Sequence, residues 1–181
     1  DVYKRQGLIG LRLAAKYSDR FEKIVAANTG LPTGKAPLSE GFAVFREFLQ
    51  IKPDLHVAGQ VRNGTTKGID ENALAAYNAP FPDDDHKQGV RQFPNLVPGT
   101  PRTPSAEPNK EAWKILREWK KPFLCAFSDK DPIFSGVENS FYKLIPGCKD
   151  MPHVTIENAG HFLQEDQPNA CVEAILSIKD I

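Results

Sequence analysis

The sequence predicts an α/β fold in which a parallel sheet carries helices on both faces. Short apolar runs at 23–28, 123–127 and 153–156 have the length and composition of buried parallel strands. The segments between and after these runs show apolar residues at helical spacing. Helices that alternate with buried strands in this way are typical of the C-terminal part of a doubly wound sheet.

Amphipathic helices are expected on either side of the predicted strands. Over 7–17 the apolar residues recur at helical spacing, and Gly7 and Gly10 should let this helix approach the sheet closely. From 110 to 121 an apolar stripe that includes Ile115 lies beside charged residues, which indicates another amphipathic helix. The remaining helices of the sheet are expected at 135–144 and 167–178.

Residues 30–110 differ in composition from the sequence on either side. They hold most of the prolines and several glycines, with short helical patterns at 41–50 and 70–77. We interpret this segment as an inserted helical cap. The α/β core is then expected to comprise 7–29 and 111–181.

Composition excludes several kinds of partner. The 23 basic residues equal the 23 acidic ones and no long run has one sign, which argues against binding to nucleic acid or to an anionic membrane. Cys125, Cys148 and Cys171 are an odd number without ligand-like spacing, so we expect reduced packing residues in a cytoplasmic protein and no metal site. The acidic run 83–86, which ends in a histidine, is interpreted as a solvated loop, because consecutive side chains point in different directions.

An acid and a histidine follow the last two predicted strands. Ligands of open α/β sheets bind beyond the carboxyl ends of the strands, where Asp131, His161 and also Asn28 are expected to meet. A histidine there can activate water, and a carboxylate bonded to its other nitrogen fixes its tautomer. Asp129 competes for the acid role. We favour Asp131, which begins a turn, because Asp129 lies so close to the strand end that it should bond backbone.

Motifs spread along the chain carry a family resemblance. They are Gly7-Leu8-Ile9-Gly10-Leu11-Arg12-Leu13, Ala27-Asn28-Thr29-Gly30-Leu31-Pro32-Thr33-Gly34, Ala79-Pro80-Phe81-Pro82-Asp83, Arg91-Gln92-Phe93-Pro94, Phe127-Ser128-Asp129-Lys130-Asp131-Pro132 and Ala159-Gly160-His161-Phe162-Leu163-Gln164-Glu165. In this order and spacing the chain resembles the haloalkane dehalogenases of the α/β-hydrolase superfamily. It is most similar to the branch in which the acid follows the penultimate strand, as Asp131 does.

The resemblance implies a mechanism with two chemical steps. An aspartate attacks the halogen-bearing carbon of a small halogenated alkane, and water activated by His161 with Asp131 then hydrolyses the alkyl-enzyme ester. The resemblance also implies that no metal or organic cofactor is needed and that the intact protein is a monomer. The residues matched to the substrate pocket are Phe42, Phe45, Phe81, Pro82, Ile133, Phe162 and Asn28.

The start of the chain departs from the family pattern. The nucleophile of the family is an aspartate followed by Trp-Gly-Gly, and Gly7 matches the second glycine. Gln6, Arg5 and Lys4 therefore stand at the positions of the first glycine, the tryptophan and the aspartate. Because a lysine cannot form the ester, we expect the chain as written to be inactive, and we interpret residues 1–6 as a non-native junction.

A second departure lies in the insertion, where Phe45 stands at a position that usually carries tryptophan in these relatives and so offers no N–H to a departing halide. Two alternatives remain open. One is an epoxide or ester hydrolase on the same scaffold, for which the Tyr77 hydroxyl could serve an epoxide. The other is a non-catalytic fragment whose exposed sheet edge favours aggregation or a molten state.

Overall fold

The computed structural model describes residues 6–179, and over these residues it contains a parallel sheet of three strands in the order β1–β2–β3. The strands are β1 (Ile24–Ala27), β2 (Phe123–Ser128) and β3 (Val154–Ile156). Ala26 pairs with Cys125 and Phe127 pairs with Thr155 in the parallel register. Each predicted apolar run is therefore a strand, and the expected parallel sheet is confirmed.

Helices account for most of the remaining described chain. The α-helices are α1 (Gln6–Lys16), α2 (Glu40–Ile51), α3 (Val57–Asn63), α4 (Glu71–Asn78), α5 (Gln88–Gln92), α6 (Ala106–Leu116), α7 (Glu138–Leu144), α8 (Leu163–Asp166) and α9 (Pro168–Ser177). Short 3-10 helices lie at Ser18–Arg20, Asp85–Lys87, Phe93–Leu96 and Pro146–Cys148. Among the α-helices, α3, α5 and α8 were not expected from the sequence.

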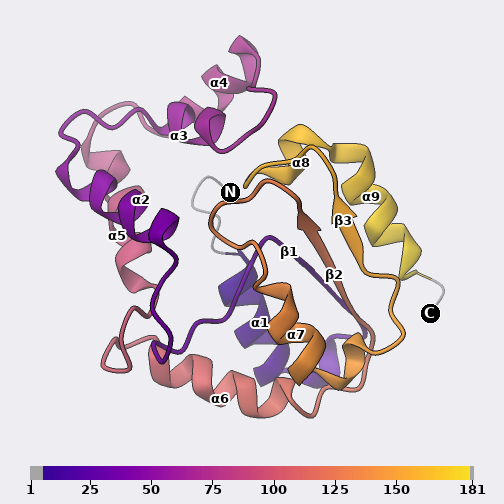
Figure 1. The fold of residues 1–181 in the computed structure, drawn as a ribbon. Coiled ribbons are helices and arrows are strands. Elements are labelled where there is room, and N and C mark those ends of the chain that lie inside the picture. The colour runs from indigo at the N-terminus through magenta and orange to yellow at the C-terminus, as the bar shows by residue number, and fades with distance from the viewer. Residues whose placement is uncertain (1–5, 180–181) are drawn as a thin grey trace.

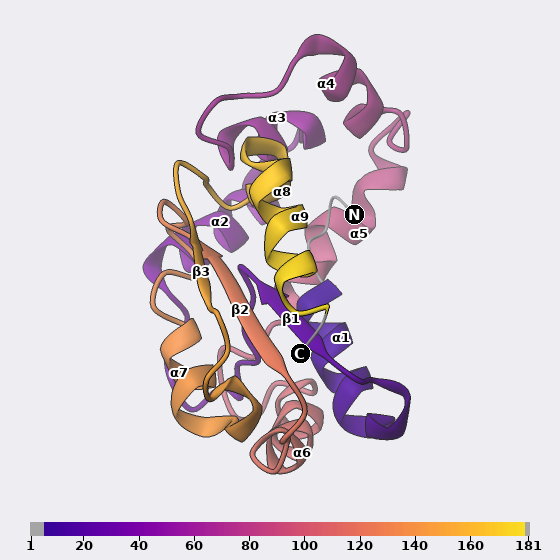
Figure 2. The same ribbon diagram turned by 90° about the vertical axis from the view of Figure 1, so that its right-hand side faces the viewer.

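The sheet is covered on both faces, as a buried parallel sheet requires. Phe123, Cys125 and Phe127 of β2 pack with residues of α1, α6 and α7. Leu124 and Ala126, which point the other way along the same strand, pack with residues of α8 and α9. Figure 1 shows α1 and α7 on one side of the sheet and α9 on the other. Figure 2 shows α3 and α4 beyond the carboxyl ends of the strands.

The helix expected at 110–121 begins and ends earlier than predicted. The predicted helix was 110–121, but α6 begins at Ala106 and ends at Leu116. Ala106 and Asn109 in its first turns are already buried, and the Asn109 amide donates a 2.6 Å hydrogen bond to the Pro32 carbonyl. A boundary at 110 would therefore divide a helix, and from here "the insertion" means residues 30–105. Ile115, expected in the buried stripe, is 44% exposed.

The two glycines of α1 behave differently. A Cβ at Gly7 would overlap the Thr29 side chain, so the expected close approach of this helix to β1 is found there. At Gly10 nothing lies within 4 Å of such a Cβ, and the same expectation is wrong. Gln6 is the first residue of α1. Residues 1–5, including the Lys4 and Arg5 of the predicted junction, lie outside the described residues.

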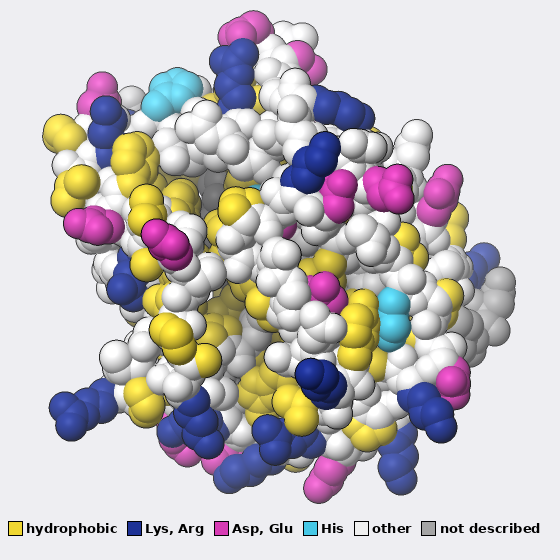
Figure 3. Space-filling view, viewed as in Figure 1, with side chains coloured by type: hydrophobic (Ala, Val, Ile, Leu, Met, Phe, Trp, Pro, Cys, Tyr) yellow, Lys and Arg dark blue, Asp and Glu magenta, His cyan; other side chains and the backbone are white. Residues whose placement is uncertain are grey.

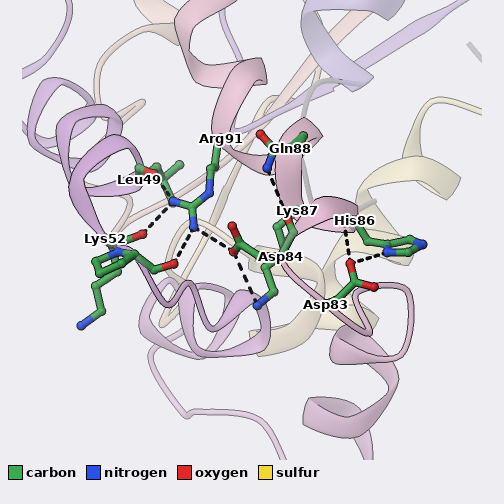
Figure 4. Close-up of polar contacts among 9 residues, drawn as sticks. Leu49, Lys52, Asp83, Asp84, His86, Lys87, Gln88 and Arg91 are labelled. Atoms are coloured by element: carbon green, nitrogen blue, oxygen red, sulfur yellow. Dashed lines mark hydrogen bonds and ion pairs between the residues drawn. The ribbon is translucent and has the colours of Figure 1, made fainter.

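The insertion has an apolar cluster of its own, which is completed by an arginine. Leu49, Leu55, Val57, Phe81 and Val90 are buried together. At its edge, as Figure 4 shows, the Arg91 guanidinium donates hydrogen bonds of 2.7–3.0 Å to the carbonyls of Leu49, Lys52 and Pro53 and to Asp84. The Leu49 carbonyl belongs to the last turn of α2 and those of Lys52 and Pro53 follow its end, where backbone carbonyls have no helical partner. Arg91 therefore fixes the loop after α2.

Replacing Arg91 with methionine is expected to lower the free energy of unfolding by about 3 kcal/mol, because several carbonyls lose a charged donor while the apolar stem is kept. The matched control is Arg62→Met. Arg62 makes only a 4.0 Å ion pair with Glu71 at the surface, and its loss should be close to neutral. Urea unfolding of both variants beside the unchanged protein checks this, and equal effects would contradict it.

Candidate active site

The ends of β2 and β3 bring a carboxylate and an imidazole together. Asp131 Oδ2 lies 2.9 Å from His161 Nδ1, and the two side chains are only 1% and 14% exposed. The other carboxylate oxygen, Oδ1, accepts a 2.8 Å hydrogen bond from the Ile133 backbone N–H. A carboxylate that accepts the Nδ1 proton leaves Nε2 as the basic nitrogen of the ring. This arrangement can orient His161 as a general base.

Asp129, the competing acid, has a different task. Its Oδ1 accepts a 3.1 Å hydrogen bond from the Ala159 N–H, and this bond lowers the pKa of Asp129 below its ordinary value. Asp129 thus supports the backbone of the loop that carries His161, whereas Asp131 contacts the ring itself. Of the two carboxylates, Asp131 is the one that lies against the imidazole, and its role as the acid stays a prediction.

Asn28 lies at the same edge of the sheet but is enclosed. It is 1% exposed and has a φ of 37°, in the left-handed region that asparagine tolerates better than most residues. Its amide donates to Ser128 Oγ at 2.7 Å and to the carbonyls of Gly160 and His161 at 3.0 and 3.2 Å. We expected a polar pocket residue. Asn28 connects the ends of β1 and β2 to the His161 loop, and it lines the groove along β1 and not the cavity beside the imidazole.

A cavity of about 380 Å³ opens beside His161, between the insertion and the core. Figure 3 shows apolar side chains around the hollow between these two parts. The expected pocket residues that line it are Phe42, Phe45, Ile133 and Phe162. The expected pocket residues that do not line it are Phe81, Pro82 and Asn28. Phe81 belongs instead to the apolar cluster of the insertion.

Sequence reasoning missed several cavity residues. The Phe134 ring stacks on the His161 ring, with centroids 5.7 Å apart and planes 15° apart. The Phe162 ring makes a T-shaped contact with the same imidazole, with centroids 5.2 Å apart. The sequence signal that could have identified Phe134 is its position, since it is an aromatic residue three places after Asp131. For Val57, Gln60 and Val61 the only signal was helical spacing within α3, an element that was itself missed.

The Tyr77 hydroxyl, which we considered for epoxide chemistry, is engaged elsewhere. It donates a 2.6 Å hydrogen bond to Glu165 Oε1 and lines a groove along β1, not the cavity beside His161. Burial and this bond raise the pKa of Tyr77 to about 12. The hydroxyl is thus a neutral donor that links α4 to α8.

The raised pKa predicts a response to alkali. The stability that Tyr77 contributes should be complete below the unfolded pKa of about 10 and should be lost as the pH rises through about 12. The measurement is an ultraviolet titration of the phenolate in the unchanged protein minus that in Tyr77→Phe. A difference curve centred near the ordinary tyrosine pKa would contradict the hydrogen bond to Glu165.

Other features of the described residues place limits on the site. Within 6–179 no three His, Cys, Asp or Glu side chains are grouped to hold a metal ion, and no helix of this part is long and apolar enough to cross a membrane. At 83–86, His86 Nδ1 lies 2.6 Å from Asp83 Oδ1, with both side chains more than half exposed. The indole of Trp113 donates to the Leu31 carbonyl, and neither it nor Trp119 lines the cavity.

The curated relatives of this chain that we compared are haloalkane dehalogenases. The protein of Psychrobacter cryohalolentis is 51% identical over 161 residues, which cover 89% of this chain and 53% of that protein. The protein of Mycolicibacterium paratuberculosis is 41% identical over 170 residues, which cover 94% of this chain and 56% of that protein. The chain thus spans about half the length of the curated relatives it matches. No family model matches it.

Solved structures agree with these relatives. The tetrameric haloalkane dehalogenase DpaA of Paraglaciecola agarilytica NO2 has a TM-score of 0.85 at 29% identity, covering 97% of this chain and 58% of that chain. DbeA of Bradyrhizobium elkani USDA94 has a TM-score of 0.74 at 18% identity, covering 96% and 65%, which supports the fold alone. The resemblance inferred from the motifs is therefore confirmed: this chain is homologous to haloalkane dehalogenases over about half of their length and has the part of the α/β-hydrolase fold that this length contains.

Proposed function

We propose that the whole protein to which this chain corresponds hydrolyses carbon–halogen bonds of small haloalkanes, giving an alcohol and a halide ion. The observation that carries the proposal is the His161–Asp131 pair at the wall of an apolar cavity of about 380 Å³. Such a cavity accepts a small apolar molecule and excludes competing water. The names of the homologues support the same reaction class.

The described residues account for the second chemical step of this reaction. Asp131 holds the His161 ring through Nδ1, so that Nε2 can take a proton from water as that water attacks an alkyl-enzyme ester. The first step needs a carboxylate that attacks carbon in line with the departing halide. No Asp or Glu of the described residues lines the cavity. We therefore propose that this aspartate precedes α1 in the whole protein, and that the chain with Lys4 at this position does not turn over.

The departing halide needs hydrogen-bond donors in a cavity with few polar groups. Among the described side chains that line it, Thr65 and Thr66 donate to carbonyl oxygens, and Lys130 donates to Asn158. The side-chain amides of Gln60 and Asn63 have no hydrogen-bond partner among the described residues. Gln60 is the better placed of the two, because it is partly buried whereas Asn63 is exposed.

The helical spacing of α3 directs Gln60 to the cavity. Val57, Gln60, Val61 and Gly64 all line it, and residues at this spacing share one face of a helix. We propose that the Gln60 amide donates an N–H to the halide, in place of the indole that is missing at Phe45.

Replacing Gln60 with leucine is expected to weaken halide binding about tenfold, because one N–H···halide hydrogen bond is lost from an apolar cavity. The measurement is bromide inhibition of alkyl bromide hydrolysis by a protein extended to include the nucleophilic aspartate. Gln50→Leu is the matched control, since Gln50 lies on α2 and its amide donates to the Arg91 carbonyl at the surface. An unchanged bromide affinity in Gln60→Leu would contradict this role.

The test of the proposed function uses an extended chain, in which residues 7–181 follow the residues that precede the matching position in the Psychrobacter relative. A short bromoalkane is supplied, and bromide and alcohol are measured together. We expect the extended chain to release both in equal amounts and the 181-residue chain to release neither. Hydrolysis of an epoxide or an ester without dehalogenation would instead support the alternative hydrolase. The monomer expected for the intact protein stays a prediction, which light scattering of the extended chain checks.

A further inference from the structure

A buried carboxylate lies five residues after His161 and plays no part in the chemistry described so far. Asp166, the last residue of α8, is 2% exposed. Its carboxylate accepts hydrogen bonds from the backbone N–H groups of Gly160 at 2.8 Å, Thr66 at 2.9 Å and Lys67 at 3.1 Å. One donor belongs to the His161 loop and two belong to the insertion, so a single side chain connects both.

The two loops meet backbone to backbone around this carboxylate. The Phe162 N–H donates to the Gly64 carbonyl at 3.1 Å, and the Thr66 hydroxyl donates to the Asn158 carbonyl at 2.8 Å. A Cβ at Gly160 would lie 2.5 Å from the Gly64 oxygen, so only glycine permits this approach. Gly64, Gly160 and Phe162 also line the cavity, and the contact between the loops therefore forms part of its wall.

The charge of Asp166 suits this position. Burial alone raises the pKa of its carboxyl, but the N–H donors of Gly160, Thr66 and Lys67 lower it, and the pKa lies below its ordinary value. An ionised carboxylate can accept from donors on both sides at once. An amide of the same shape has only one acceptor atom, and its NH₂ group would face an N–H of one of the two loops.

We propose that Asp166 is a positioning residue that holds loop 64–67 of the insertion and the His161 loop in one fixed arrangement, so that the roof of the cavity and the general base keep their relative geometry. The proposal rests on the proposed function for its catalytic consequence. The structural part, the connection between the two loops, stands on the hydrogen bonds alone.

The test compares Asp166→Asn with the unchanged extended chain. Amide hydrogen exchange should speed up at least tenfold at Gly160, Thr66 and Lys67, since the amide oxygen can accept from only one of the two loops and the connection that orders both is lost. Steady-state kcat for the bromoalkane should fall about tenfold, while the first equivalent of bromide is still released, because His161 acts only after halide has left. Asp129→Asn is the matched control. It removes a carboxylate of the turn after β2 that also bonds the His161 loop but does not reach the insertion, so Thr66 and Lys67 should keep their protection.

A variant with a distant core defect separates positioning from general destabilisation. Leu116→Ala removes a fully buried side chain beneath the sheet, and its kcat should stay near that of the unchanged protein at a temperature where both are folded. Equal losses of kcat in Leu116→Ala and Asp166→Asn, or unchanged exchange at the three amides, would overturn the proposal.

The proposal can still be decided if Asp166→Asn does not fold or if the extended chain releases no halide. If Asp166→Asn does not fold, Asp166→Glu is measured instead: the charge is kept but displaced, and exchange at the three amides should rise by a smaller factor. Unchanged exchange and kcat in Asp166→Glu would overturn the proposal. If the unchanged extended chain releases no halide, the proposed function fails, and the exchange measurements alone still decide whether Asp166 joins the loops.

Discussion

Turnover by the extended chain is expected to stop after one release of halide when His161 is replaced with alanine. Halide leaves during the attack by the nucleophile, and the His161–Asp131 pair is needed only when water attacks the ester. General base catalysis contributes about 10²–10⁴-fold, so the steady-state rate should fall about 10³-fold. Rapid-quench measurement of bromide should show a burst equal to the enzyme concentration, and mass spectrometry should show the protein carrying the alkyl group.

His86→Ala is the matched control for this experiment. His86 is an exposed residue of the insertion that contacts Asp83 and does not line the cavity, so its loss should leave turnover intact. A His161→Ala protein that continues to turn over near the original rate would show that another group activates water. The absence of any burst would show that His161 acts before halide leaves, and either result contradicts the proposed order of steps.

The core of this fold could be predicted because its signals are local. Residues 123–127 are an unbroken apolar run, and a strand buried on both faces needs no other pattern. The helix over 7–17 was also predicted nearly as it is, since apolar spacing and sheet packing agree there. The start of α6 was missed because its first turns hold Asn109, whose burial depends on a carbonyl 77 residues earlier in the chain.

The insertion shows why the remaining elements could not be predicted. α3 has only seven residues and begins at a His56 cap, so its apolar pattern is too short to stand out from a loop. Its importance comes from tertiary packing, since it places Gln60 and Gly64 at the cavity and against the His161 loop. Asn28 illustrates the same limit in the core. Its position after β1 was predictable, but its enclosure by Ser128 and two carbonyls is not written in neighbouring residues.

Asp131 and Asp129 lie two residues apart, and replacing Asp131 is expected to have the second large effect on turnover. Asp131→Asn in the extended chain is expected to lower kcat about 10³–10⁴-fold with little change in fold. Oδ1 of Asp131 already accepts from the Ile133 N–H, so the amide oxygen should take that place. The amide NH₂ would then face His161 Nδ1, which must become the acceptor, and the ring proton moves to Nε2. The base would be present but protonated at the nitrogen that has to take a proton from water.

The Asp129→Asn variant distinguishes the change of the His161 tautomer from a general disturbance of the loops. Asp129 is two residues away and also bonds the segment before His161, but through the Ala159 backbone, so its amide variant should lose no more than a few-fold in kcat. Nitrogen NMR of the His161 ring reports the tautomer directly, and only Asp131→Asn should move the proton to Nε2. If the two variants lose activity equally with an unchanged tautomer, the turn after β2 positions His161 as a whole and neither carboxylate selects its basic nitrogen. A loss confined to Asp131→Asn, with the tautomer exchanged, would identify one hydrogen bond of 2.9 Å as the interaction that makes the imidazole a base.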